Sequence, residues 1–137
     1  MKKAIKNFII FLIIVVTLII FMFVFARYGW KLFGFALCDS PDMNFTEVVA
    51  VEDNTVHIEG GTQDSFSSFV GYVYKIDGSN LYIGVKHNLF LGFFSRIGSF
   101  DITIDARKAK ITKIYYKNSK AERLIWTIEG GILRHQN

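Results

Sequence analysis

The sequence contains a single cysteine, a single proline and few charged residues, and each shortage excludes a class of protein. One cysteine cannot form an internal disulfide, so the chain is not a disulfide-stabilised scaffold. One proline excludes collagen-like and proline-rich linker sequences. Charged residues make up only 20% of the chain and hydrophobic residues 51%, a more apolar balance than that of ordinary soluble domains. The 14 phenylalanines exclude intrinsic disorder, and a length of 137 residues accommodates one domain.

An apolar run at residues 8–26 contains no charged residue. At about 1.5 Å per residue, a helix over this run would be roughly 28 Å long, close to the hydrocarbon thickness of a bilayer. Because the run is apolar on all sides and not only on one face, it predicts a membrane-spanning anchor. The residues that we expect to lie in or beside the bilayer include Phe8, Ile14, Thr17, Phe21, Ala26 and Trp30.

Basic residues flank the apolar run unequally. Lys2, Lys3 and Lys6 precede it, whereas Arg27 and Lys31 follow it. Because the flank with more positive charge tends to stay in the cytoplasm, residues 1–7 are predicted to form a cytoplasmic tail and the rest of the chain to lie outside. The flanks therefore predict a single-pass protein of the cell membrane with an extracytoplasmic domain.

Residues 27–43 are predicted to form an interfacial collar and linker. Trp30 lies between the two cations that follow the run, and aromatic residues favour the headgroup layer. Cleavage as a signal peptide after Ala26 or Ala36 stays open, although the run exceeds the usual apolar length of about 7–15 residues. Cys38 is interpreted as a free thiol near the membrane. Its acylation also stays open, although the residues before it depart from a lipobox at two positions.

The positive charge of the chain belongs to the anchor. Residues 1–38 contain five Lys or Arg and no acidic residue, whereas residues 39–137 contain eleven Lys or Arg and twelve Asp or Glu. The net charge of +4 therefore gives no reason to expect a nucleic-acid partner for the folded part. The lipid bilayer is the expected partner, an envelope protein or an anionic polymer is an open possibility, and the oligomeric state is undetermined.

From residue 45 onward, short segments rich in β-branched and aromatic residues alternate with turn residues. Asp77-Gly78 lies between two apolar segments and is a strong hairpin signal. Phe100, Ile102 and Ile104 alternate with polar residues, which is typical of a strand with one buried face. The pattern predicts an all-β domain at residues 44–129, a small antiparallel β-sandwich or open barrel of about seven strands, and a tail at 130–137. The predicted strands are 45–51, 55–59, 68–76, 81–86, 100–104, 110–117 and 122–128.

The apolar positions of these strands predict the core of the domain. We expect the following side chains to be buried: Val48, Ala50, Val56, Ile58, Val70, Tyr72, Tyr74, Leu81, Ile83, Phe100, Ile102, Ile104, Ile114, Leu124 and Trp126.

Two stretches stand out as candidate contact patches. Residues 87–98 are apolar where a loop is normally polar, and they either cap the core or dock on a membrane or partner. The stretch from Arg107 to Arg123 is basic, and it is either a solvated edge hairpin or a patch for an anionic polymer or lipid headgroup. The patch residues are Phe90, Phe93, Phe94, Lys110, Lys113 and Lys117.

The sequence holds no strong catalytic or metal-binding motif. His57 and Glu59 share one face of a strand, but further metal ligands are distant in sequence. Asp101 and Asp105 also share a face, yet about 13 Å would separate them, more than the roughly 5–9.5 Å of glycosidase carboxylates. We therefore expect both pairs to be solvated surface residues. The sequence predicts no catalytic site, no metal and no cofactor.

Four segments carry a resemblance to known proteins: GYVYKIDGSNLYIGV at 71–85, FDITID at 100–105, KIYYKN at 113–118 and RLIW at 123–126. With these segments the chain resembles small membrane-anchored or lipoprotein-like proteins of Gram-positive bacteria that carry an uncharacterised outer β domain. The resemblance spans residues 45–127. It implies a bacterial cell envelope, and it implies neither an activity nor functional residues.

Together these features predict a membrane-anchored protein that is not an enzyme and that binds or scaffolds at the cell envelope. Two alternatives stay open. The chain could be a sensor or accessory subunit of a membrane complex, although the anchor has no Gly-x-x-x-Gly seam for helix packing. It could also be a hydrolase whose site is scattered through the sequence, with His57, Asp101 and Asp105 as the candidate residues.

Overall fold

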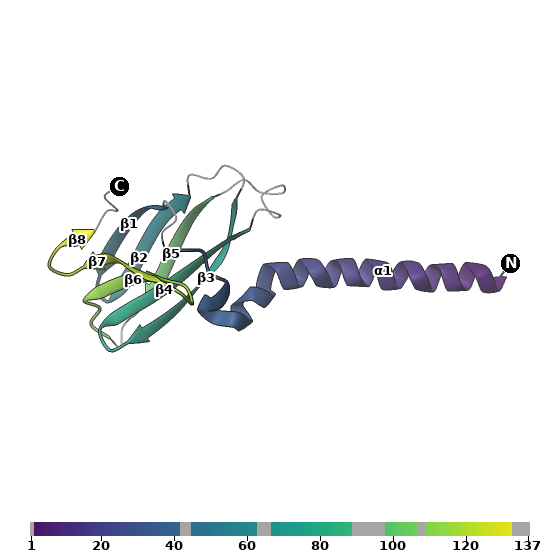
Figure 1. The fold of residues 1–137 in the computed structure, drawn as a ribbon, viewed down its shortest axis with the longest axis horizontal. Coiled ribbons are helices and arrows are strands. Elements are labelled where there is room, and N and C mark those ends of the chain that lie inside the picture. Colours follow the sequence, from purple (N-terminus) through teal and green to yellow (C-terminus); the bar gives the residue numbers. More distant parts are fainter. Residues whose placement is uncertain (1, 42–44, 63–66, 89–97, 107–108, 133–137) are drawn as a thin grey trace. The chain divides into compact units, whose positions relative to one another are not determined.

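The structure, a computed structural model, describes residues 2–41, 45–62, 67–88, 98–106 and 109–132. The chain divides into two compact units, Met1–Phe33 and Gly34–Asn137. The first unit is helical, and the second holds the described strands (Figure 1).

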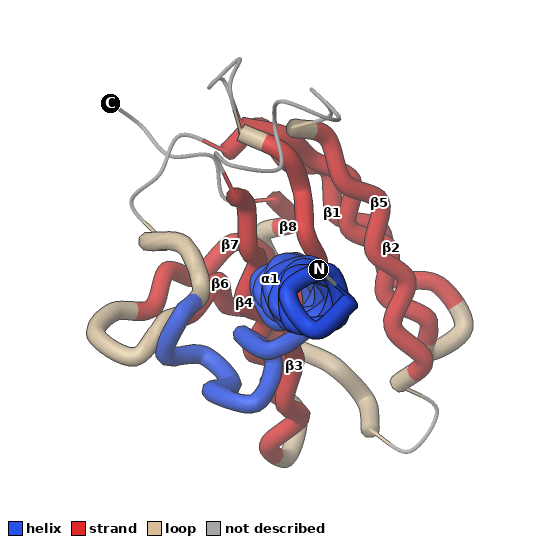
Figure 2. Tube along the Cα trace, turned by 90° about the vertical axis from the view of Figure 1, so that its right-hand side faces the viewer, coloured by secondary structure: helices blue, strands red, loops and turns tan. Residues whose placement is uncertain are grey.

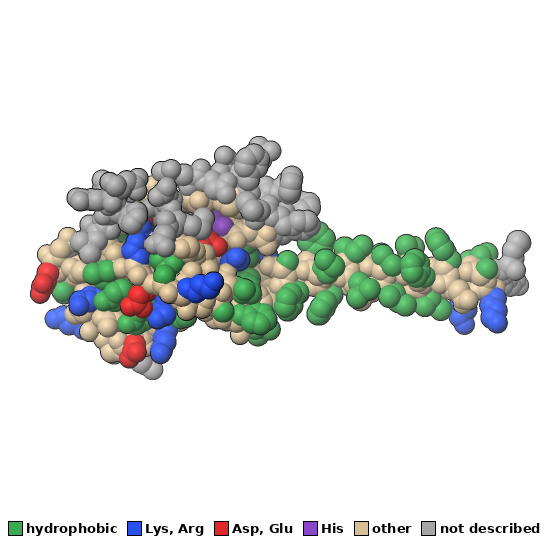
Figure 3. All heavy atoms as spheres, in the orientation of Figure 1, with side chains coloured by type: hydrophobic (Ala, Val, Ile, Leu, Met, Phe, Trp, Pro, Cys, Tyr) green, Lys and Arg blue, Asp and Glu red, His purple; other side chains and the backbone are tan. Residues whose placement is uncertain are grey.

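The first unit consists of helix α1 (Lys2–Tyr28) and the beginning of the 3-10 helix η1 (Gly29–Leu37), which a non-helical Gly34 interrupts. The apolar window of this region has a mean hydropathy of 3.5 and is 0% buried. Hydrophobic side chains cover the visible side of α1, and lysines lie at its N-terminal end (Figure 3). Thr17 does not interrupt this surface, because its hydroxyl donates to the carbonyl of Ile13 at 2.8 Å. The helix is long and apolar enough to cross a membrane.

The described strands of the second unit form two open sheets. β1, β2 and β5 form a three-stranded sheet in the order β1-β2-β5, and the other strands form a five-stranded sheet in the order β3-β4-β6-β7-β8. Figure 2 shows β1, β2 and β5 side by side, apart from the strands of the second sheet. The strands are β1 (Phe45–Glu52), β2 (Thr55–Thr62), β3 (Ser68–Asp77), β4 (Asn80–Asn88), β5 (Ser99–Asp105), β6 (Lys113–Lys117), β7 (Glu122–Thr127) and β8 (Gly131–Ile132).

Three hairpins join neighbouring strands, including the one predicted at Asp77-Gly78, and their turn residues explain them. Asp53 and Asn54 both have positive φ between β1 and β2, as a type I′ turn requires. Gly78 has φ of 60° at the first position of the turn between β3 and β4, where a side chain would be strained. Between β6 and β7, the side chain of Asn118 accepts hydrogen bonds from the backbone N–H groups of Lys120 and Ala121 at 2.8 Å.

The prediction of an antiparallel fold is wrong at one pair, and the described residues form eight strands where about seven were predicted. β4 and β6 run parallel, with Tyr82 opposite Tyr115. The cause lies in β5, which follows β4 in the chain but pairs with β2 in the other sheet. The chain that returns from β5 to form β6 then runs in the direction of β4. The eighth strand, β8, is a two-residue addition to β7.

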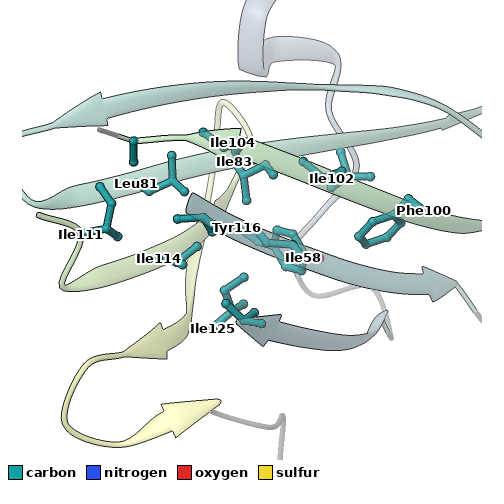
Figure 4. Close-up of a cluster of buried hydrophobic side chains, with 14 residues drawn as sticks. Ile58, Leu81, Ile83, Phe100, Ile102, Ile104, Ile111, Ile114, Tyr116 and Ile125 are labelled. Carbon is teal, nitrogen blue, oxygen red and sulfur yellow. The ribbon is translucent and has the colours of Figure 1, made fainter. Parts of the chain in front are cut away.

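The core is shared by the two sheets (Figure 4). Ile58 and Ile102 extend from the three-stranded sheet, and Leu81, Ile83 and Ile114 extend from the five-stranded sheet. Alternation along β5 is complete, since each odd position is exposed and each even position buried. Of the predicted core residues, those confirmed as buried are Val56, Ile58, Val70, Leu81, Ile83, Phe100, Ile102, Ile104 and Ile114.

The predicted phase of β1 is wrong by one residue. Ala50 is exposed, and Val49 is buried in its place. The run from Val48 to Val51 has no polar alternation, so the pairing with β2 decides which residues face inward. Val49 lies opposite Ile58, and residues that are opposite each other share a face of the sheet. The side chain of Val48 lies outside the described residues.

Four further core predictions need correction. Tyr74 lies on the edge strand β3 and is 50% exposed. Leu124 is only half-buried, whereas its neighbour Ile125 is completely buried. The reason is a bulge in β7, where the register with β6 passes over Ile125 and reverses the alternation. Tyr72 and Trp126 are partly buried against the core.

A nearly buried ion pair joins the two sheets at one margin of the core. Nη2 of Arg123 on β7 donates to Oε1 of Glu47 on β1 at 3.0 Å, and the two side chains are 12% and 4% exposed. The guanidinium also lies over the ring of Tyr116, 5.4 Å from its centroid. Burial, and to a lesser degree Glu47, raises the pKa of Tyr116, and Arg123 offsets part of this rise. The charged groups of Arg123 and Glu47 are therefore both largely desolvated.

Replacing Arg123 is expected to destabilise the domain because it leaves the Glu47 carboxylate buried without its cation. We expect Arg123→Met to lower the free energy of unfolding by about 3 kcal/mol, measured by urea denaturation of the full chain in detergent. The matched control is Lys117→Met, which breaks the exposed pair with Glu122 at 3.1 Å and is expected to cost less than about 1 kcal/mol. The double variant Glu47→Leu/Arg123→Met should recover most of the loss. Equal losses for Arg123→Met and Lys117→Met would contradict the buried role of the pair.

Candidate binding surface

The outer face of the five-stranded sheet gathers lysines and tyrosines from three strands. Leu81, Ile83 and Ile114 point into the core, so their chain neighbours point outward. The register of β3 and β4 places Lys75 opposite Tyr82, and the parallel pairing of β4 and β6 places Tyr82 opposite Tyr115. We name this surface the Lys/Tyr face, and it consists of Lys75, Tyr82, Lys113, Tyr115 and Lys117.

The two tyrosines of this face form an aromatic pair beside a cation. The rings of Tyr82 and Tyr115 are stacked, with centroids 5.2 Å apart and planes 17° apart. Nζ of Lys117 lies 5.0 Å from the centroid of Tyr82 and 3.1 Å from Oε2 of Glu122. Lys75 and Lys113 are exposed. Strand pairing holds the backbone of all five residues, so three lysines and two tyrosines occupy fixed positions along one face of the sheet.

The structure brings two predicted patch residues, Lys113 and Lys117, onto the Lys/Tyr face. Lys110 is exposed and precedes β6. Phe90, Phe93 and Phe94 lie outside the described residues. Sequence reasoning missed Tyr82 and Tyr115 as partners because only the parallel pairing of β4 with β6 joins them. One signal was available: Lys113, Tyr115 and Lys117 are spaced two residues apart, which predicts that they share a face of their strand.

The outer face of the three-stranded sheet has the opposite charge. Glu59 lies directly opposite Asp101, and Asp105 lies on the same face along β5. Nδ1 of His57 lies 3.1 Å from the hydroxyl of Thr103, so one ring nitrogen already has a partner. Strands β1, β2 and β5 contain no Lys or Arg. We name this surface the acidic face, and it consists of Glu52, His57, Glu59, Asp101 and Asp105.

The acidic face unites two pairs that the sequence suggested separately, His57 with Glu59 and Asp101 with Asp105. Both pairs lie on the outer side of the sheet. Within the described ranges, no three His, Cys, Asp or Glu side chains come close enough together to hold a metal ion. The face is thus a solvated acidic surface in the part of the chain that the structure describes.

A polar cluster attaches residues 34–41, the connecting segment, to strand β4. The backbone N–H of Asp39 donates to the carbonyl of Val85 at 2.8 Å, and the Asp39 carboxylate accepts from the backbone N–H of His87 at 2.8 Å. The same carboxylate lies 2.8 Å from Nδ1 of His87 and 3.7 Å from Nζ of Lys86. The connecting segment therefore pairs with β4 beyond the end of β6.

His87 in this cluster closes one end of the core. Its ring packs against Phe69 and Phe100, with centroids 5.8 Å and 6.1 Å away. Its Nε2 lies 3.0 Å from the carbonyl of Gly98, which can only accept. An Asp–His pair beside a cysteine is the arrangement of a cysteine nucleophile, but here the nitrogen that would face the nucleophile is used by a backbone carbonyl. The contacts favour a structural role.

Cys38 is buried in the same segment, and its surroundings make it a poor nucleophile. Its thiol lies over Gly84 and donates weakly to the carbonyl of Gly34 at 3.7 Å. Burial raises the pKa of Cys38 to about 12, with a further rise from Asp39 and a partial offset from Lys86. An acyl chain on this sulfur would require the connecting segment to leave the sheet.

The predicted anchor residues all lie in the first unit. Phe8, Ile14, Thr17 and Phe21 are exposed along α1, and Ala26 is half-buried. Trp30 is 4% exposed, and its indole N–H donates to the carbonyl of Arg27 at 3.0 Å. The indole N–H, which would face water in an interfacial collar, is thus satisfied by the backbone.

Comparison with known proteins found no match among protein-family models, among curated proteins or among solved structures.

Adding a methyl group at Gly84 is expected to expose the Cys38 thiol. A Cβ at this position would lie 2.5 Å from Sγ of Cys38 and 2.9 Å from the ring of Phe35, so the connecting segment must shift. We expect Gly84→Ala to accelerate maleimide labelling of Cys38 in the folded protein.

Because the pKa of Cys38 is raised to about 12, the labelling rate of the parent chain should keep rising with pH beyond 9.0, the ordinary thiol value.

The control for this experiment is Gly61→Ala, whose Cβ would have no neighbour closer than 3.4 Å. This variant should label as slowly as the parent. Equal labelling rates for Gly84→Ala and Gly61→Ala, under conditions in which both are folded, would show that the packing on Gly84 does not protect the thiol.

Proposed function

We propose that this chain is a single-pass membrane protein whose β domain is a non-enzymatic binding module at the cell envelope. The observation that carries the proposal is the Lys/Tyr face, where Lys75, Lys113 and Lys117 surround the stacked rings of Tyr82 and Tyr115. Ammonium groups attract phosphate and carboxylate groups, and phenols add hydrogen bonds and stacking. The ligand class is an anionic group, carried by an envelope polymer or by lipid headgroups.

The location rests on the N-terminal sequence. The apolar helix α1 would serve as the anchor, and the three lysines before it favour a cytoplasmic N-terminus with the β domain outside. The domain itself is best classed as a small β-sandwich with one parallel pair, because its two open sheets share one core. The resemblance to membrane-anchored proteins of Gram-positive bacteria agrees with this location.

The distribution of charge supports directional binding. Lysines outnumber carboxylates on the outer face of the five-stranded sheet, where Asp77 and Glu122 also lie, whereas the strands of the other sheet carry carboxylates on their outer face and contain no Lys or Arg. An anionic ligand is therefore attracted to the Lys/Tyr face and repelled by the acidic face. Because the folded part is near neutral, net charge alone would not produce this preference.

The test uses the full chain in detergent with polyphosphate as the anionic probe and dextran as the neutral one. We expect polyphosphate binding that weakens with added salt, and no dextran binding. Lys113→Gln should weaken polyphosphate binding about fivefold, since a lysine near an anionic surface contributes about 1 kcal/mol. The triple variant Lys75→Gln/Lys113→Gln/Lys117→Gln should weaken it on the order of 100-fold.

The matched control is Lys120→Gln, which removes the same charge from the turn after β6. This variant should bind polyphosphate nearly as well as the parent. Equal losses for Lys113→Gln and Lys120→Gln would overturn the assignment of the ligand to the Lys/Tyr face, and so would equal binding of dextran.

A further inference from the structure

We infer that the anionic ligand of the Lys/Tyr face is the headgroup layer of an anionic bilayer. This inference rests on the proposed function and adds the source of the anion. Three observations within the β domain point to lipid headgroups: the place where the chain joins the domain, the chemistry of the face, and the opposite charge of the two sheets.

The connecting segment joins the domain on the same outer face that carries the lysines and tyrosines. Gly84 alternates with the inward-facing Ile83 and Val85, so its missing Cβ points outward. Phe35 and Cys38 occupy that outer space over Gly84, which is two residues along β4 from Tyr82 and on the same face. The residues that lead back to the apolar helix therefore begin on the Lys/Tyr face. A bilayer crossed by that helix is within reach of a short length of chain.

The chemistry of the face matches the headgroup layer. Lysine places an ammonium on a long apolar stem, and tyrosine combines an apolar ring with a polar hydroxyl, as residues at membrane surfaces do. On the connecting segment, Leu37 is 44% exposed and adds an apolar side chain for the boundary between headgroups and acyl chains. A soluble polyanion would use the lysines but would gain nothing from an exposed leucine.

The acidic face gives the domain a preferred orientation at such a surface. Glu52, Glu59, Asp101 and Asp105 lie on the sheet that is packed against the back of the five-stranded sheet. An anionic bilayer attracts the lysines of one sheet and repels these carboxylates of the other. Both effects turn the Lys/Tyr face toward the lipid.

The experiment measures the proximity of each face to lipid headgroups in the full chain, reconstituted in nanodiscs. A fluorophore is attached to Asn80→Cys on the Lys/Tyr side, or to Ala50→Cys on the acidic side, while Cys38 stays buried. Each label is read against a lipid with a quencher on its headgroup. The discs contain phosphatidylcholine alone or phosphatidylcholine with added phosphatidylglycerol.

We expect quenching at Asn80→Cys to increase when phosphatidylglycerol is present, to fall again with salt, and to stay low at Ala50→Cys. The triple variant Lys75→Gln/Lys113→Gln/Lys117→Gln should lose the increase, whereas Lys120→Gln should keep it. Equal quenching at the two positions would overturn the inference, and so would quenching that does not depend on phosphatidylglycerol.

The soluble probe separates this inference from the proposed function. If Lys113→Gln weakens polyphosphate binding but no quenching depends on phosphatidylglycerol, the face binds an anionic polymer and the lipid inference fails. If the triple lysine variant changes neither readout relative to Lys120→Gln, both the proposed function and the lipid inference fail. If quenching depends on phosphatidylglycerol and on the three lysines, headgroups are the ligand.

Discussion

The mutual burial of two one-sided sheets is the constraint on which the rest of the β domain depends. Water has almost no access to Ile58 and Ile102 on one sheet or to Leu81, Ile83 and Ile114 on the other. Each of these side chains contributes roughly 1.5–3 kcal/mol to stability before the entropy of ordering is subtracted. Once these residues face inward, the period of two along a strand leaves no choice for their neighbours. The acidic face and the Lys/Tyr face are therefore products of the core.

Two polar contacts mark the margins of this core, and each decides which elements meet there. Glu47 and Arg123 bring β1 to β7, and Asp39 brings the connecting segment to His87 on β4. Such contacts add less net stability than apolar packing of the same size, but an incorrect pairing would leave a charge buried without a partner. Both contacts therefore act on specificity: they penalise arrangements in which the sheets or the connecting segment are misplaced.

Local signals were sufficient for the helix, the three hairpins and the alternating strand β5, because each depends on residues close together in sequence. The sequence could not decide the phase of β1, where four consecutive apolar residues give no alternation, or the bulge at Ile125 in β7. It also could not place β5 in the other sheet, which makes β4 and β6 parallel and joins Tyr82 to Tyr115. The lysines of the candidate site were visible as a basic stretch, but their aromatic neighbours and the role of Asp39 depend on contacts between distant residues.

The parallel pairing of β4 with β6 has a consequence for how the domain forms. A tight turn cannot join β4 to β6, because the two strands are parallel. The chain between them includes β5, which pairs with β2 in the other sheet. The sheet of the β1–β2 hairpin is likewise completed only by β5, which follows the hairpin by about 40 residues. Non-local pairings of this kind close late and slowly, since loop entropy is lost before contacts form. Helix α1, by contrast, consists only of local contacts and precedes the strands in the chain, so we expect it to form faster than the β domain.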